Sequence, residues 1–233
     1  MTPQHPPRFA AAVFDMDGLL LDSERPLRTA WMDAAAQHGC VLGDADYLSV
    51  VGLNHTDSHA RFLTLFGGDA SLLERVRGSA QELVRQRFDG RGFDAKPGAL
   101  RLLQGLQRGG VACAVASSTH LGEVRRRLEA ARLLRYFAAV CGGDEVAHGK
   151  PHPDLYALAL TRLGVNAAQG VAFEDSGHGV RSAWSAGLAV VAVPDLLAPP
   201  LPWLQRCLAV FDTLEDVCRH SRAWFGIRCA DAP

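Results

Sequence analysis

The chain lacks the features that mark several large classes of protein. Lysine and arginine (24) nearly balance aspartate and glutamate (25), so the net charge of -1 gives no electrostatic reason to expect a nucleic acid or a membrane as partner. No apolar run approaches the ~20 residues that cross a bilayer, and residues 1–8 are polar and proline-rich, unlike a signal peptide. We therefore expect a cytoplasmic protein.

The six cysteines form no Cys-x-x-Cys pair, so neither a zinc ribbon nor a dithiol redox motif is indicated. They are scattered like small apolar residues, as is usual in a reducing compartment. What remains is an ordinary globular composition, with 48% hydrophobic and 21% charged residues in a chain of 233. Such a chain can form one large domain, or a core with a smaller second unit.

Two aspartates at the end of a short apolar run are the centre of the interpretation. The run Phe9–Phe14 contains β-branched Val13 and predicts a buried strand. Alternation along the strand would place Asp15 and Asp17 on the same side, and Gly18 then permits a tight turn. Because unpaired buried charge is costly and open α/β sheets bind ligands at the carboxyl ends of strands, this position favours chemistry. Taken alone, the motif could also be an Asp-x-Asp-Gly surface turn.

Residues 22–94 contain no second strand of comparable quality and form an insertion that we expect to be entirely helical. A flexible polar connection at 89–94 would return the chain to the main body. The predicted division is a core of residues 1–21 and 95–233 with a helical cap of residues 22–94. Helices are predicted in this insertion at Arg28–Gln37, Thr56–Phe66 and Ser71–Arg87.

From Lys96 onward the pattern alternates between helix and strand, which predicts an α/β fold, a Rossmann-like parallel sheet with helices on both faces. The last clear strand is expected to end before Pro194, and the tail from Leu214 is expected to be helical. The strands are predicted at 111–116, 137–141, 170–173 and 188–193, and the helices at 97–109, 121–134, 153–163 and around 183.

Four groups of polar residues fall at or just after the ends of predicted strands. In a parallel sheet, strand ends of one polarity lie along one edge, so these side chains can converge on a single site. The four groups are Asp15 with Asp17, Ser117 with Ser118, Lys150, and Glu174 with Asp175.

Five motifs, in order along nearly the whole chain, carry a family resemblance. The chain resembles the haloacid dehalogenase (HAD) superfamily phosphohydrolases, in the branch that has a helical cap after the first strand and includes β-phosphoglucomutase-like proteins. The resemblance implies a central first strand and a cap that opens and closes. The motifs are Asp15-Met16-Asp17-Gly18 with Asp22-Ser23-Glu24, Pro97-Gly98, Ala116-Ser117-Ser118, Gly149-Lys150-Pro151-His152-Pro153-Asp154, and Phe173-Glu174-Asp175-Ser176 with Gly179-Val180.

The resemblance implies a nucleophile, an acid–base residue and a metal. Asp15 would attack phosphorus and become an aspartyl phosphate, and Asp17 would protonate the leaving oxygen and later deprotonate water. Like charges ~4 Å apart repel by about 4 kcal/mol at an effective dielectric near 20, so a phosphate dianion needs a cation here. Mg²⁺ would bind Asp15, the main-chain carbonyl of Asp17 and Asp175, with Glu174 binding directly or through water.

The same resemblance gives the phosphate-binding groups. Ser117 offers a hydroxyl and, with Ser118, main-chain N–H groups where a strand passes into a helix. A helix N-cap is the other role open to Ser117, and both roles can hold together. Lys150 would neutralise Asp15 and the transferring phosphoryl group.

The predicted cap loop bears on the reaction class. Asn54 and His55 follow Gly52 there and are candidate substrate contacts, although residues in such loops are more often simply exposed. The mutase pattern has a histidine where this chain has Leu27, and a lysine and an arginine where it has Val51 and His55. Without those cations, which would hold a second phosphate, transfer to water is favoured over transfer to a sugar.

The sequence therefore predicts a Mg²⁺-dependent phosphatase acting through an aspartyl phosphate on a small phosphorylated metabolite, of which a sugar phosphate is one option. A phosphosugar mutase is the alternative reaction, and a non-catalytic phosphate-binding module is a third interpretation. We expect a monomer or a weak homodimer, with no nucleic acid or membrane partner.

Overall fold

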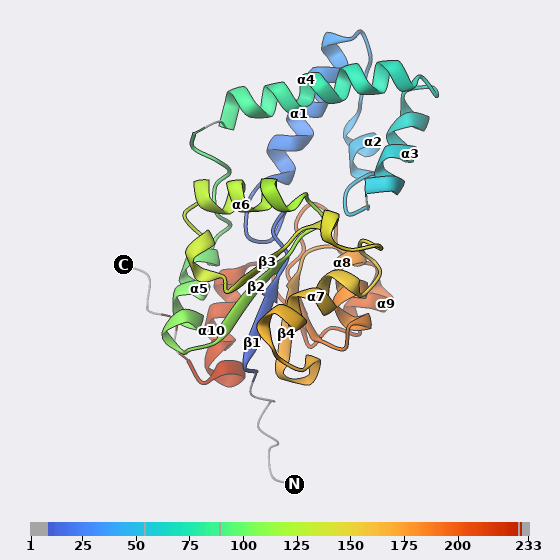
Figure 1. The fold of residues 1–233 in the computed structure, drawn as a ribbon. Helices are drawn as coiled ribbons and strands as arrows, with labels where there is room; N and C mark the ends of the chain where they lie inside the picture. The colour runs from blue at the N-terminus through green and yellow to red at the C-terminus, as the bar shows by residue number, and fades with distance from the viewer. Residues whose placement is uncertain (1–8, 54, 89, 228, 230–233) are drawn as a thin grey trace.

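A parallel sheet lies at the centre of the fold in the computed structural model, which describes residues 9–53, 55–88, 90–227 and 229 (Figure 1). All neighbouring strands pair in parallel, in the order β3-β2-β1-β4-β5-β6. The predicted α/β fold with a parallel sheet is confirmed. The strands are β1 (Ala11–Phe14), β2 (Ala112–Ala116), β3 (Ala139–Cys141), β4 (Gly170–Glu174), β5 (Ala189–Ala192) and β6 (Ala209–Val210).

Strand β1 lies between β2 and β4 and is buried along its whole length. In this register Phe14 pairs with Val115 of β2 and with Phe173 of β4, and the Phe14 and Phe173 rings stack with centroids 4.7 Å apart. Residues that follow these three positions, Asp15 among them, therefore leave the sheet at the same edge.

Helices cover both faces of the sheet, as predicted. One face is covered by α5 (Ala99–Arg108), α6 (Leu121–Ala130) and α10 (Leu214–Phe225). The other face is covered by α7 (Asp154–Leu163), α8 (Gly177–Ser185) and α9 (Leu201–Leu204). Apolar side chains of each group pack on the strands in a separate buried cluster, because parallel strands in such folds are apolar on both sides.

A helical layer made of residues 24–88 lies beyond α6, away from the sheet (Figure 1). The chain enters and leaves this layer along two adjacent segments, where the Asp22 N–H donates to the Asp94 carbonyl at 2.9 Å. The layer has its own buried cluster, which includes Phe62 and Leu73. Its helices are α1 (Glu24–Gln37), α2 (Asp44–Leu48), α3 (His55–Leu65) and α4 (Ala70–Phe88).

The structure corrects several details of the sequence interpretation. Helix α6 ends at Ala130 rather than at 134, because Arg132 takes a left-handed φ of 59° and Leu134–Tyr136 form a separate 3-10 turn. Strand β6 and the short helices α2 and α9 were not predicted. No helix among the described residues is both long and apolar enough to cross a membrane.

Candidate active site

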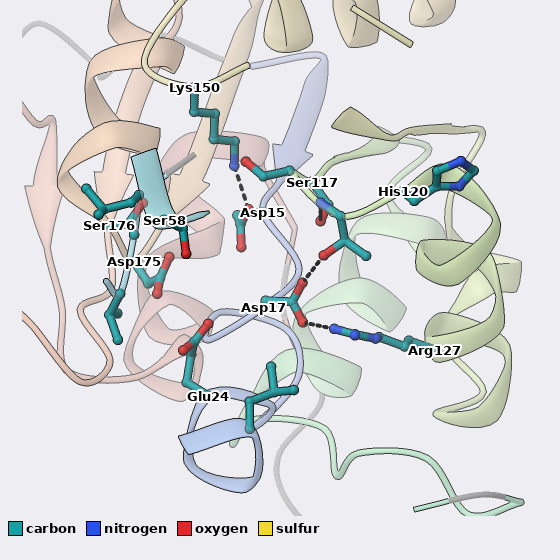
Figure 2. A pocket seen from close by; sticks show the side chains of 16 residues that line it. Asp15, Asp17, Glu24, Ser58, Ser117, His120, Arg127, Lys150, Asp175 and Ser176 are labelled. Carbon is teal, nitrogen blue, oxygen red and sulfur yellow. Dashed lines mark hydrogen bonds and ion pairs between the residues drawn. The ribbon is translucent and has the colours of Figure 1, made fainter. Parts of the chain in front are cut away.

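The carboxyl ends of the strands bring the sequence-predicted residues to one edge of the sheet (Figure 2). One group follows β1, a second follows β2, and a third lies at the end of β4, while a lysine reaches the edge from the loop between β3 and α7. The cavity at this edge has a volume of about 340 Å³. Its lining includes Asp15, Asp17, Ser117, Ser118, Lys150 and Asp175.

Lys150 is buried in this edge and forms two ion pairs. Its Nζ donates to Asp15 Oδ1 and to Glu174 Oε1, each at 2.5 Å, and only 4% of the residue is exposed. Burial alone would lower the pKa of Lys150, but the charges of Asp15 and Glu174 outweigh it and raise the pKa above its usual value. Lys150 is therefore a fixed positive charge beside Asp15.

Glu174 lies beneath the cavity rather than in its wall. Its Oε1 accepts from Lys150 and from the Tyr156 hydroxyl at 2.7 Å, and its Oε2 accepts from the N–H groups of Asp175 and Ser176 at 3.1 and 3.3 Å. The side chain is fully buried. With both oxygens already accepting hydrogen bonds, Glu174 is placed to hold Lys150 and the turn after β4, not to reach a ligand in the cavity.

Asp15 and Asp175 are two buried carboxyl groups, and Lys150 donates a hydrogen bond to the first of them. Burial raises the pKa of Asp15 to about 8, against the lowering effect of Lys150. The pKa of Asp175 is raised well above 3.8, first by burial and then by the charge of Asp15. Among the described residues, no group donates a hydrogen bond to the Asp175 carboxylate. This pair has the chemistry of a site that a cation completes.

The donor set at this edge is suited to an oxygen-bound cation. No cluster of three His, Cys, Asp or Glu side chains in the described ranges is arranged to hold a metal ion. A site formed by the carboxylates of Asp15 and Asp175 together with main-chain oxygen and water matches Mg²⁺, which keeps several waters and takes few protein side chains. The residues present therefore fit this ion.

Asp17 is held by three side-chain donors. Its Oδ1 accepts from Ser23 Oγ at 2.7 Å and from Arg127 Nη1 at 2.8 Å, and its Oδ2 accepts from Thr119 Oγ1 at 2.9 Å. Figure 2 shows the carboxylate turned toward Arg127. The three donors come from three separate segments of the chain, so the direction of this carboxylate is set by the tertiary fold.

Gly18 is required where β1 gives way to the turn. Its φ is +85°, a left-handed conformation that costs a residue with a Cβ atom about 1–2 kcal/mol. A Cβ atom at this position would also lie 2.4 Å from Asp175 Oδ2. The absence of a side chain therefore lets the Asp175 carboxylate approach the turn that carries Asp17.

The segment after β2 differs in one respect from the prediction. The Ser117 N–H donates to the Cys141 carbonyl at 3.1 Å and so extends the sheet, which means that it is not free to bind phosphate. The Ser117 hydroxyl accepts from the Thr119 N–H at 3.1 Å, and Ser117 and Ser118 both line the cavity. Ser117 is not the cap of α6, because His120 precedes that helix and accepts from Gly122.

The helical layer contributes three apolar side chains to the cavity wall, beside the polar Glu24 and Ser58. The three are Leu27, Val51 and Leu53. Of the predicted substrate contacts, Asn54 lies outside the described residues, and only the main chain of His55 is described, as the first residue of α3.

Glu24 adds a further carboxyl group to the cavity. It is the first residue of α1 and lies near Asp17. Burial, followed by the negative charges of Asp17 and Asp195, raises the pKa of Glu24 from 4.5 to about 7. The protonated form of Glu24 is therefore favoured more strongly than in a solvent-exposed glutamate.

The sequence interpretation missed four residues that support the site: Ser23, Thr119, Arg127 and Tyr156. Ser23 and Thr119 were visible as neighbours of recognised motifs, and their short hydroxyl side chains were a usable signal. Arg127 is one of three consecutive arginines on α6, and no local pattern tells which of them faces the sheet edge. Tyr156 lies within an apolar helix, where a buried hydroxyl cannot be distinguished from an ordinary core aromatic residue.

Comparisons with known proteins agree with this architecture. The family model described as haloacid dehalogenase-like hydrolase matches residues 12–193. A phosphorylated carbohydrates phosphatase of Thermotoga maritima is 31% identical over 178 residues, which cover 76% of this chain and 82% of that protein. The chloroplastic protein SUPPRESSOR OF QUENCHING 1 of Arabidopsis thaliana is 33% identical over 204 residues, 82% of this chain but 18% of that much longer protein.

A solved structure shares the fold over most of the chain. The crystal structure of CbbY from Rhodobacter sphaeroides in complex with phosphate superimposes with a TM-score of 0.76 at 28% identity, covering 90% of this chain and 96% of that one. The family resemblance predicted from the motifs is confirmed, and this chain belongs to the haloacid dehalogenase-like hydrolase family.

Proposed function

We propose that this protein is a phosphatase that hydrolyses small phosphate monoesters through an aspartyl phosphate on Asp15. The observation that carries the proposal is the ion pair of 2.5 Å between Asp15 and buried Lys150 in a cavity that also contains Asp17. A carboxylate fixed beside a cation, with a second carboxyl group two residues later, provides the nucleophile and the acid–base group that phosphoryl transfer requires.

Asp15, Asp175 and the main-chain carbonyl of Asp17 would hold Mg²⁺. The unpartnered carboxylate of Asp175 and the raised pKa values of both aspartates support this assignment. When bound, the ion supplies positive charge that offsets repulsion between these carboxylates and the phosphate. Glu174, whose oxygens are already used, is proposed to position Lys150 and to act on the ion only indirectly.

The protein groups divide the reaction into two displacements. An Asp15 oxygen bonds to phosphorus while the ester P–O bond breaks, and the leaving oxygen takes a proton from Asp17. In the second step Asp17 accepts a proton from water, the water oxygen bonds to phosphorus, and the bond between phosphorus and Asp15 breaks. Inorganic phosphate leaves and Asp15 is restored.

The phosphoryl oxygens would be held by groups at the ends of β2 and β3. Lys150 offers its charge, the Ser117 side chain offers its hydroxyl, and Ser118 offers its main-chain N–H. Lys150 stabilises both the nucleophile before attack and the charge that develops on the transferring group.

The helical layer is proposed to act as a cap domain of residues 22–94 that closes over the cavity. Its two connections to the core run side by side, which suits a hinge. The loop after α2 already reaches the sheet edge, because a Cβ atom at Gly52 would lie 3.4 Å from the Ser176 Cβ. Closure would exclude water during the first displacement.

Hydrolysis is favoured over a mutase reaction by two apolar residues in the wall of the cavity. Leu27 and Val51 line it where a mutase would need cations for a second phosphate. We accordingly propose a small phosphorylated metabolite as substrate. The name of the Thermotoga relative supports a phosphorylated carbohydrate, and the complex of CbbY with phosphate supports a phosphate-containing ligand. We further propose a cytoplasmic protein that is a monomer or a weak homodimer.

The test is a panel of phosphorylated metabolites incubated with the purified protein and Mg²⁺. We expect steady phosphate release from at least one ester and none from the Asp15→Asn variant. Interconversion of glucose 1-phosphate and glucose 6-phosphate without net phosphate release would instead identify a mutase. Phosphate release that survives Asp15→Asn would refute the assignment of the nucleophile.

A further inference from the structure

Arg127 is a cation in the cavity that the motifs do not account for. The acidic side chains that line the cavity outnumber the lysine and arginine side chains. Lys150 is engaged by Asp15 and Glu174, which leaves Arg127 as the partner of Asp17. The charged residues of the lining are Asp15, Asp17, Glu24, Asp175, Arg127 and Lys150.

The guanidinium group of Arg127 is fixed from three directions. Its Nε donates to Glu123 Oε1 at 2.7 Å, one helical turn earlier on α6, and its Nη1 donates to Asp17 Oδ1 at 2.8 Å. Its Cζ lies 5.2 Å from the centre of the Phe93 ring, in the segment that returns from the helical layer. The side chain is only 13% exposed. It is therefore a rigid donor rather than a mobile surface charge.

The direction of the Asp17 carboxylate depends on donors of this kind. The terminal torsion of an aspartate has a broad, two-fold preference, so the side chain alone does not fix where its oxygens point. Ser23 shares Oδ1 with Arg127, while Thr119 binds Oδ2. All three bonds are to a carboxylate, and of these three donors only Arg127 is itself charged, so it forms an ion pair as well as a hydrogen bond with Asp17.

Arg127 also stands where the cavity continues toward the helical layer. It lines a neighbouring cavity of about 270 Å³ that shares Leu27 and Ser58 with the first and extends to Trp31 and Gln81. The leaving group of an ester bound at Asp15 has room there, next to the pair of Asp17 and Arg127.

We propose that Arg127 is a positioning residue for departure of the leaving group, because it orients Asp17 toward the leaving oxygen. The inference rests on the proposed phosphatase function. Arg127 exchanges no proton itself: Asp17 gives its proton to the ester oxygen as the P–O bond breaks. An alkyl ester needs that proton, whereas an aryl ester such as para-nitrophenyl phosphate leaves as a stable anion and does not.

The test compares kcat/KM for an alkyl phosphate and for para-nitrophenyl phosphate in Arg127→Met, Asp17→Asn and the double variant. We use kcat/KM because it reports the first displacement alone. Arg127→Met should lower the alkyl value by about 10- to 100-fold and the aryl value by less than about threefold. The double variant should be no worse than Asp17→Asn on the alkyl ester. Arg125→Met, at an exposed position two residues earlier on α6, is the matched control and should change neither value.

Arg127→Lys should not restore kcat/KM for the alkyl ester, because an ammonium group cannot bind both Glu123 and Asp17 in the way that the forked guanidinium group does. Equal losses on both esters, or additive losses in the double variant, would overturn the proposal. A crystal structure of Arg127→Met gives a readout that is independent of turnover. Asp17 should turn away from Thr119 there, and an unchanged Asp17 would also overturn the proposal. If the wild type hydrolysed neither ester, the proposed phosphatase function would be refuted. The crystal structure of Arg127→Met would still show whether Arg127 orients Asp17.

Discussion

Replacing Lys150 with methionine removes the central charge of the site while nearly keeping the shape of the side chain. The ammonium group is buried and forms ion pairs of 2.5 Å with Asp15 and Glu174. Loss of one preorganised donor to the transition state typically lowers kcat by about 10²–10³, and a buried charge should matter at least as much. The rate constant of the variant should fall further, because the pKa of Asp15, about 8 with Lys150 present, should rise when that charge is removed and leave a smaller fraction of Asp15 as the ionised nucleophile.

The stability of the same variant gives a second, pH-dependent readout. Removing one partner of a buried ion pair costs about 3–5 kcal/mol when the other charge stays uncompensated. The pKa of Asp15 is about 8 with Lys150 present, and it should rise further without it. The folded variant then binds more protons than the unfolded chain, so its free energy of unfolding should rise as the pH falls. Wild-type Asp15, with its pKa of about 8, also keeps its proton at acidic pH, so the two proteins should differ mainly above pH 8, and the loss relative to wild type should be larger at pH 9 than at pH 6.

The assay is phosphate release at saturating Mg²⁺, together with urea unfolding at both pH values. Arg219→Met is the control, because Arg219 pairs with Asp216 on the surface and is 70% exposed. Arg219→Met should lower the free energy of unfolding by less than about 1 kcal/mol and leave the rate of phosphate release unchanged. A folded Lys150→Met variant with kcat within tenfold of wild type would refute the charge argument.

Three further predictions concern the carboxyl groups and the turn around the cavity. Chelation of Mg²⁺ should abolish phosphate release, and Asp175→Asn should weaken Mg²⁺ affinity by more than about tenfold in calorimetric titration; unchanged affinity would exclude Asp175 as a ligand. Glu24 titrates near pH 7 in the fold, so without metal the wild type should lose stability relative to Glu24→Gln as the pH rises from 4.5 through 7. The difference in the free energy of unfolding should be at most about 3 kcal/mol, and the partial exposure of the side chain should make it smaller. If the stabilities of the two proteins changed in parallel across this pH range, the raised pKa of Glu24 would be contradicted. Gly18→Ala should lower the free energy of unfolding by about 1–2 kcal/mol and weaken Mg²⁺ binding, since its Cβ would displace Asp175; a fully stable variant with normal affinity would show that the turn tolerates a side chain.

The sequence was sufficient for the strands that carry Asp15 and Asp175, because each is a short apolar run that ends in charged residues. Burial on both faces and the position of the charges are local signals, and they predict the sheet and its active edge together. Strand β6 has only two residues, Ala209 and Val210, too few for any periodicity. Helices α2 and α9 are similarly short, and their ends depend on contacts rather than on a pattern.

The support of the site was harder to predict than its reactive groups. Arg127 meets Asp17 across 110 positions of the chain, and this contact depends on how α6 is rotated on the sheet. The role of Glu174 was also ambiguous, because the sequence alone does not tell whether an acidic residue next to Asp175 binds the metal ion or forms an ion pair with Lys150. Only the hydrogen bonds to Tyr156 and to the turn show that its oxygens are already used.

Mass spectrometry of the acid-quenched enzyme during turnover tests the nucleophile most directly. Using Asp17→Asn with para-nitrophenyl phosphate, which should form the intermediate and hydrolyse it slowly, we expect a phosphoryl group on the peptide that contains Asp15. Continued phosphate release with that peptide unmodified, or with the phosphoryl group on another residue, would contradict the account.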